Sequence, residues 1–112
     1  ETLIKTYFDD EWKPILQTPP FPEYTSGHSV ASGAASTVLT SIFGNNFYFD
    51  DDTELTFGLP IRSFASFEAA ADEATMSRMY GGIHFRSSVE IGLNQGKKIG
   101  KLVTENLIMA HE

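Results

Sequence analysis

The apolar positions between residues 29 and 43 recur three and four apart, which is the spacing of an amphipathic helix. Gly44 follows the last of them and supplies a C-terminal stop. This predicted helix also has several residues with small side chains, which would let the backbone of another helix come close. The small residues are Ser29, Ser32, Gly33, Ala34 and Ser36.

A second helix is predicted to begin after Ser66 and to run through Tyr80. Ser66 is a residue type that caps helix starts, and Glu68 in the first turn is favoured by the helix dipole. The pair Gly81-Gly82 comes directly afterwards and ends the helix. The sequence therefore places a break in the backbone between this helix and the next one.

The longest predicted helix covers residues 83–110, with apolar side chains along one side. Gly92, Gly96 and Gly100 are spaced four apart and form a single groove along it. At 1.5 Å per residue this helix would be about 42 Å long. A compact domain of this chain length has a radius of gyration of about 13 Å. We therefore expect an all-α fold that is the C-terminal part of a larger helical bundle.

The remaining segments have weaker patterns. Residues 2–16 have helix-like spacing that Pro14 weakens, and they predict a short helix. Residues 18–24 contain three prolines and should run extended. Residues 45–64 alternate weakly around the turn expected at Asp50-Asp51-Asp52, which indicates a short hairpin or an ordered loop.

The composition is that of one globular domain in a chain of 112 residues. With 8 basic against 15 acidic side chains the formal charge is -7. This charge argues against nucleic acid and against anionic lipid as partners. The chain has no cysteine, which leaves the redox compartment open, and no apolar run approaches the roughly 18 to 20 residues of a membrane span. Any anion site must therefore be local.

The first candidate for chemistry is the point where the proline-rich arm meets a helix, at Ser26, Gly27 and His28. A helix start has unpaired backbone N–H groups and partial positive charge, so an anion can bind there. Gly27 lets the backbone come close, Ser26 offers a hydroxyl, and His28 offers a titratable proton. The alternative is that Ser26 only caps the helix and His28 is a surface side chain.

The second candidate joins Arg78 and His84 across the Gly81-Gly82 break. In one straight helix these two side chains would be rotated by about 240° from each other. The glycine break removes that obstacle, so both can turn toward one point. The guanidinium of arginine has a planar fork that matches the oxygens of phosphate or vanadate. The alternative is a simple helix junction with a solvent-facing Arg78 and a hydrogen-bonded His84.

Taken together, residues 18–29, followed by Ser77-Arg78 and then His84, resemble the vanadium-dependent haloperoxidases. The type 2 phosphatidic acid phosphatases and the bacterial acid phosphatases are relatives with the same pattern. The likeness in residues 19–24 and 81–86 is closest to soluble bacterial haloperoxidase-like proteins. The resemblance identifies residues 1–112 as the C-terminal portion of a helical domain of this superfamily.

The resemblance implies that Ser26, the Gly27 amide and Arg78 bind the equatorial oxygens of phosphate or vanadate. His84 would be the axial ligand of vanadium in a haloperoxidase, which has vanadate as its cofactor. In a phosphatase, which needs no cofactor, His84 would be the phosphoryl-accepting nucleophile. His28 would meet the apical oxygen where peroxide binds, or act as general acid for a leaving group. The resemblance also suggests a periplasmic or secreted location.

The chain departs from the family pattern in having no early motif with a lysine followed by an Arg-Pro pair. That motif would add two cations to the oxyanion site. A charge-assisted hydrogen bond is worth about 1.5 to 3 kcal/mol, so this chain alone is expected to be nearly inactive. We expect the motif upstream, in a missing N-terminal portion of the same domain or in a second chain.

A further departure is Ser88, where the phosphatases have an aspartate four residues after the nucleophilic histidine. Ser88 has no charge to stabilise an imidazolium, and Glu90 would lie about 200° further round the helix. This difference favours the haloperoxidase-like branch over the phosphatases.

The leading hypothesis is therefore an oxyanion-binding enzyme domain that oxidises halide with hydrogen peroxide. One alternative is a phosphatase that hydrolyses phosphomonoesters through a phosphohistidine. Another is a phosphate-binding module without catalysis, suggested by the missing cations and Ser88. The last is a structural helical subunit, suggested by the long glycine-grooved helix.

Overall fold

The computed structural model describes residues 1–107, and its helices form a small bundle from which a hairpin at residues 49–64 projects. The all-α expectation is confirmed, with one two-stranded sheet added. The helices and strands, in chain order, are α1 (Thr2–Tyr7), α2 (Gly27–Phe43), β1 (Phe49–Asp51), the 3-10 helix η1 (Leu55–Phe57), β2 (Arg62–Phe64), α3 (Phe67–Tyr80) and α4 (Arg86–Asn106).

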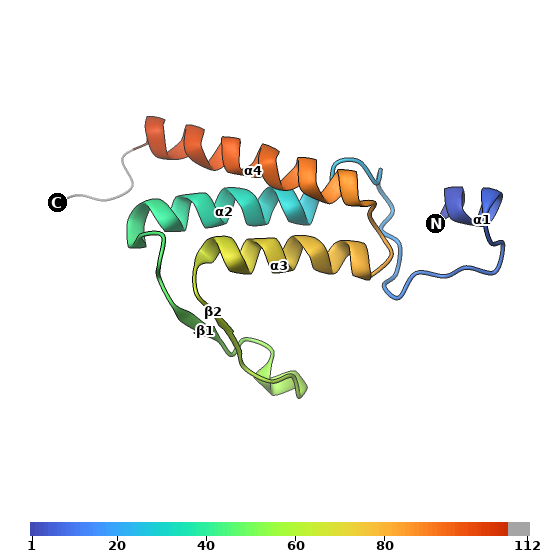
Figure 1. Ribbon diagram of the computed structural model, residues 1–112, viewed down its shortest axis with the longest axis horizontal. Coiled ribbons are helices and arrows are strands. Elements are labelled where there is room, and N and C mark those ends of the chain that lie inside the picture. Colours follow the sequence, from blue (N-terminus) through green and yellow to red (C-terminus); the bar gives the residue numbers. More distant parts are fainter. Residues whose placement is uncertain (108–112) are drawn as a thin grey trace.

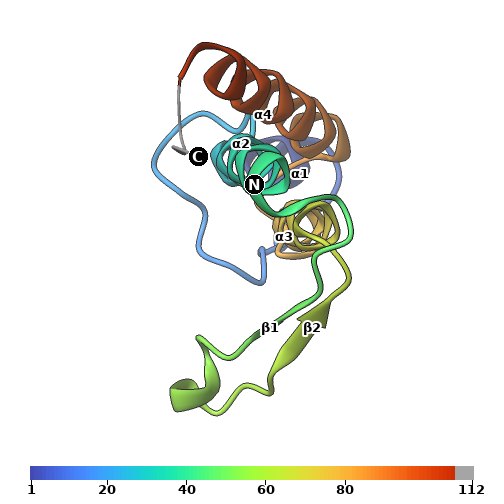
Figure 2. The same cartoon turned by 90° about the vertical axis from the view of Figure 1, so that its left-hand side faces the viewer.

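Three helices make the bundle. Helix α2 packs against both α3 and α4, and α3 also contacts α4. Figure 1 shows these three running side by side, and Figure 2 shows α2 between the other two when the bundle is seen end on. Helix α1 lies beyond one end of the bundle, and none of the described helices is long and apolar enough to cross a membrane.

The predicted glycine groove of α4 is confirmed and receives the backbone of α2. A Cβ added at Gly92 would lie 2.9 Å from the Ser26 carbonyl oxygen, and one at Gly100 would lie 2.6 Å from that of Ala34. The approach is mutual, because a Cβ at Gly33 would lie 2.5 Å from the carbonyl oxygen of Leu93. Small residues on both helices thus bring the two backbones together, as the sequence indicated.

Helix α4 begins at Arg86, three residues later than predicted. Gly82 has a φ of 78°, a left-handed conformation that keeps the link between α3 and α4 from being helical. The 21 residues of α4 span about 32 Å rather than the expected 42 Å. Residues 108–110 of the predicted helix lie outside the described residues.

The apolar side of α4 is less buried than its pattern suggested. Val89 has no exposed surface, whereas 42% of Ile99 and 60% of Leu107 are exposed. The reason is that the glycines, rather than the large apolar side chains, face α2. Part of the predicted apolar face therefore has no partner within the described chain.

The predicted helix over residues 2–16 is wrong beyond Tyr7. The chain instead turns back toward the link between α3 and α4, where the Leu16 amide donates to the Gly81 carbonyl at 3.0 Å. A Cβ added at Gly82 would lie 3.1 Å from Pro14. Since Pro14 has no N–H to continue a helix, the segment packs over the two glycines instead.

The predicted hairpin is confirmed in residues 45–64. Strands β1 and β2 pair antiparallel with Phe49 opposite Phe64, and Phe49 stacks on Phe67 at 5.1 Å between ring centroids. Asp50 and Asp51 lie inside β1, so the turn comes after them, later than predicted. Hydrogen bonds from the hydroxyls of Ser63 and Tyr48 hold the pKa of Asp50 below its usual value.

Candidate active site

The residues singled out from the sequence lie on helix ends at one end of the bundle. Helix α2 begins there, α3 ends there and α4 begins there (Figure 1). Ser26 stands directly before α2, Arg78 lies in the last turn of α3, and His84 stands two residues before α4. A hydrogen bond of 3.3 Å from the Ser26 amide to the Ser88 carbonyl joins the starts of α2 and α4.

Ser26 caps α2, as one of the two interpretations of its role required. Its Oγ accepts the Ser29 amide at 3.3 Å and the Ser29 hydroxyl at 2.9 Å. Ser26 has no exposed surface. A hydroxyl that accepts two hydrogen bonds still has its own proton, so capping does not prevent Ser26 from donating to an oxyanion.

Gly27 and His28 are exposed and open the first turn of α2. Within the described residues, neither backbone amide donates a hydrogen bond to another protein group. A Cβ added at Gly27 would meet nothing within 4 Å. The helix start thus offers unpaired N–H groups beside open space, which is the arrangement that binds anions.

Arg78 is partly buried, and its Nε donates to the Ser77 hydroxyl at 3.2 Å. No ion pair involves Arg78 in the part of the chain that the structure describes. Its two terminal guanidinium nitrogens remain available as donors. The structure places Arg78 at the same end as His84 but shows no bond between the two.

His84 is buried and its ring is fixed by a backbone group. Its Nδ1 lies 2.8 Å from the carbonyl oxygen of Glu23. A carbonyl oxygen can only accept, so Nδ1 must donate the proton. In the neutral ring Nε2 then has a free lone pair. The structure therefore leaves Nε2 as the nitrogen able to coordinate or attack.

Glu23 was not among the residues expected to take part. Its carbonyl also accepts the Ser88 hydroxyl at 2.8 Å, and its Oε1 accepts the Phe85 amide at 2.8 Å. The same Oε1 lies 3.4 Å from Nδ1 of His84. Nothing in sequence spacing could connect Glu23 with His84, because a fold-dependent contact joins them across 61 positions.

A cavity of about 280 Å³ lies beside His84. Ser26, Gly27, His28 and Arg78 are not part of its wall. The cavity therefore shares only His84 with the predicted oxyanion residues. Its wall is mainly apolar or aromatic, with Ile4, Trp12, Met79, Ile83 and Phe85 beside the polar Glu1, Glu23, His84 and Arg86 and the link residue Gly82.

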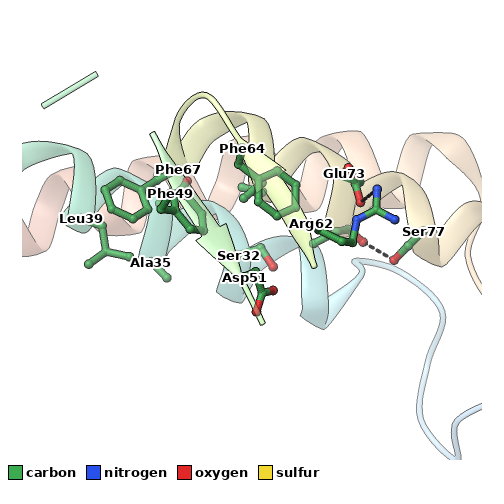
Figure 3. A pocket seen from close by; sticks show the side chains of 14 residues that line it. Ser32, Ala35, Leu39, Phe49, Asp51, Arg62, Phe64, Phe67, Glu73 and Ser77 are labelled. Atoms are coloured by element: carbon green, nitrogen blue, oxygen red, sulfur yellow. Dashed lines mark hydrogen bonds and ion pairs between the residues drawn. The ribbon is translucent and has the colours of Figure 1, made fainter. Parts of the chain in front are cut away.

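A larger cavity of about 490 Å³ lies between the β1–β2 hairpin and helices α2 and α3 (Figure 3). Phe49, Phe64 and Phe67 line it, and the ion pair between Arg62 and Glu73, 2.5 Å long, stands at its side. It holds none of the predicted site residues. Among the described residues, no three or more His, Cys, Asp or Glu side chains are grouped to hold a metal ion.

Comparison with known proteins gives the context of this geometry. Residues 3–111 match the family model described as the VCPO second helical-bundle domain. A bacterial vanadium-dependent iodoperoxidase is 64% identical, with a TM-score of 0.94 over 99% of this chain and 27% of that chain. No curated protein matches.

Two structures of a bacterial vanadium-dependent chloroperoxidase, holo-type and apo-type, are each 22% identical over 87% of this chain with a TM-score of 0.68. The match covers 23% of the holo-type chain and 24% of the apo-type chain, and at this identity it shows the fold. The chain thus spans about a quarter of the length of the solved relatives.

Proposed function

Since the chain belongs to the family of VCPO second helical-bundle domains, we propose that it forms part of the vanadate site of a haloperoxidase. The enzyme would oxidise a halide ion with hydrogen peroxide. Iodide is the expected halide, because the relative with 64% identity is an iodoperoxidase. The overall reaction takes one halide ion, one peroxide molecule and one proton to hypohalous acid and water.

The observation that carries this proposal is that His84 is buried and that a hydrogen bond fixes the orientation of its ring. Its ring is buried at the end of the bundle, and Nδ1 donates to the Glu23 carbonyl. Nε2 is then the nitrogen that would hold vanadium, as imidazole nitrogens do in metal sites. Vanadate, when bound there, would supply a Lewis-acidic centre that activates hydrogen peroxide.

The neighbouring donors would bind the equatorial oxygens of vanadate. The Ser26 hydroxyl has a proton to give, the Gly27 amide has no partner among the described residues, and the terminal nitrogens of Arg78 are unpaired there. Donors held in place around an anion stabilise the charge that develops on it. The two cations of the lysine and Arg-Pro motif would come from another part of the enzyme.

His28 would move the proton that the reaction consumes. Its side chain is exposed at the first turn of α2, next to the open space in front of Gly27. An imidazole ring can both accept and donate a proton in a catalytic step. In this role His28 would protonate the leaving oxygen of peroxide without touching vanadium.

The test is iodide oxidation by the full-length protein, purified free of vanadate and followed by triiodide absorbance with hydrogen peroxide. We expect activity only after vanadate is added, and none in His84→Ala. A wild-type protein that oxidises no halide with vanadate would contradict the proposal. Release of p-nitrophenol from its phosphate ester without vanadate would instead support the phosphatase alternative.

A further inference from the structure

We propose that Glu23 is the positioning residue of His84. In the phosphatases that the sequence resembles, an aspartate four residues after the histidine has this role, and Ser88 stands there in this chain. The structure brings a carboxylate to the histidine from the proline-rich arm instead. This inference rests on the proposed function, because it assigns a role toward the same bound vanadate.

Glu23 holds the segment around His84 through three hydrogen bonds. Its carbonyl accepts Nδ1 of His84 and the Ser88 hydroxyl, each at 2.8 Å. Its Oε1 accepts the Phe85 amide at 2.8 Å. The residues before α4 and in its first turn therefore cannot shift relative to Glu23 without breaking one of these bonds.

The carboxylate of Glu23 also faces the ring, with Oε1 3.4 Å from Nδ1 of His84. The His84 side chain is 2% exposed, so little water reaches it to weaken the effect of that charge. A histidine that binds a metal commonly donates its other N–H to a carbonyl or carboxylate, which fixes the ring and raises its basicity. Glu23 brings two groups to one nitrogen: its carbonyl accepts the Nδ1 proton, and its carboxylate lies beside that nitrogen as a negative charge.

Ser88 acquires a different role in this arrangement. Its hydroxyl donates to the Glu23 carbonyl, and its own carbonyl accepts the Ser26 amide at 3.3 Å. Ser88 is fully buried. Ser88 therefore joins the proline-rich arm to the starts of α2 and α4. It holds Glu23 in place and does not replace the missing aspartate.

The experiment compares Glu23→Gln and Glu23→Asp in the full-length protein. Glutamine has the same length and can still accept the Phe85 amide, but it lacks the charge that faces Nδ1. Aspartate retains the charge on a shorter side chain. Glu90→Gln is the matched control, because Glu90 is an exposed carboxylate on α4, 3.5 Å from Arg86. It removes one charge near the same end of the bundle without contacting His84.

The first readout is the Kd of vanadate, measured by calorimetry. Loss of such an outer partner costs about 10- to 100-fold in metal affinity, so we expect that loss in Glu23→Gln. Glu23→Asp should recover part of it, and Glu90→Gln should bind as wild type does. A Kd for Glu23→Gln within twofold of wild type would overturn the proposal.

The second readout needs no vanadate. In protein labelled with ¹⁵N-histidine, the Nδ1 proton of His84 should give a resonance in NMR spectra. The chemical shift of this resonance should move upfield in Glu23→Gln and stay unchanged in Glu90→Gln. If wild type binds no vanadate but this shift occurs, the proposed function fails and the Glu23–His84 contact stands. An unchanged Nδ1 resonance with lower thermal stability would mean that Glu23 only caps α4, which also overturns the proposal.

Discussion

At the scale of single residues, the site is built from groups that also hold the fold together. Ser26 caps α2 and has a proton left to give, while Glu23 accepts bonds from three neighbours of the α4 start. Because the same residues satisfy backbone groups and are proposed to bind or position the oxyanion, a substitution here should change stability and binding together. A matched residue elsewhere is needed to separate the two effects.

Ser26 and Ser66 provide that comparison. Both cap a helix by accepting an amide three residues on, the amides of Ser29 and Ala69. We expect Ser26→Ala and Ser66→Ala each to lower the free energy of unfolding by about 0.5 to 2 kcal/mol in urea denaturation. Only Ser26→Ala should also raise the Kd of vanadate, by about one to two orders of magnitude, since a hydrogen bond to a charged group is lost. An equal Kd of vanadate in both variants would show that Ser26 only caps α2 and does not bind the oxyanion.

At the scale of the elements, the contact between α2 and α4 holds the starts of these two helices, and with them the candidate site, in place. The three buried glycines of α4 let the carbonyls of α2 come within a distance that no side chain would permit. The proposed oxyanion site needs a fixed separation between the starts of α2 and α4, and close backbone packing provides it. The projecting β1–β2 hairpin, by contrast, lies on the side away from α4 (Figure 2).

Gly96→Ala tests this contact. The added Cβ would collide with the carbonyl of Val30, and backbone cannot move aside as a flexible side chain can. We expect a loss of about 1 to 3 kcal/mol in the free energy of unfolding, measured by urea denaturation. Gly27→Ala is the control for stability, because its Cβ would meet nothing within 4 Å. Equal stability of the two variants would show that α2 and α4 can separate without cost.

At the scale of the whole molecule, the described chain is extended. Its radius of gyration is 16.4 Å, against about 13 Å for a compact chain of this length. Among the described residues, the buried hydrophobic side chains are only Ala71, Ile83 and Val89. Many large apolar side chains are exposed instead, among them Phe8, Ile15 and Phe57. A core this small stabilises a fold weakly.

We therefore expect the isolated 112-residue chain to unfold at low temperature and to bind a hydrophobic dye such as ANS. The full-length protein should show a higher unfolding temperature and little dye binding, because its other parts would cover the exposed apolar surface. Calorimetry and dye fluorescence on both proteins measure this difference. A sharp, dye-free unfolding transition of the isolated chain at the temperature of the full-length protein would contradict it.

Local signals in the sequence were sufficient for much of the fold. The end of α2 at Phe43, the Ser66 cap of α3 and its end at Tyr80 follow from apolar spacing, capping residues and glycine stops. The glycine groove was also predictable, because residues four apart share a helix face. These features depend on near neighbours in the chain, so no knowledge of the tertiary structure was needed.

The tertiary structure alone decided how the site is held. Glu23 and His84 stand 61 positions apart, and neither motif contains a signal that pairs them. The packing of residues 12–16 on the two glycines of the link is a second contact of this kind, between segments far apart in the chain. Sequence patterns report the preferences of neighbouring residues, whereas these contacts exist only once the helix ends have met.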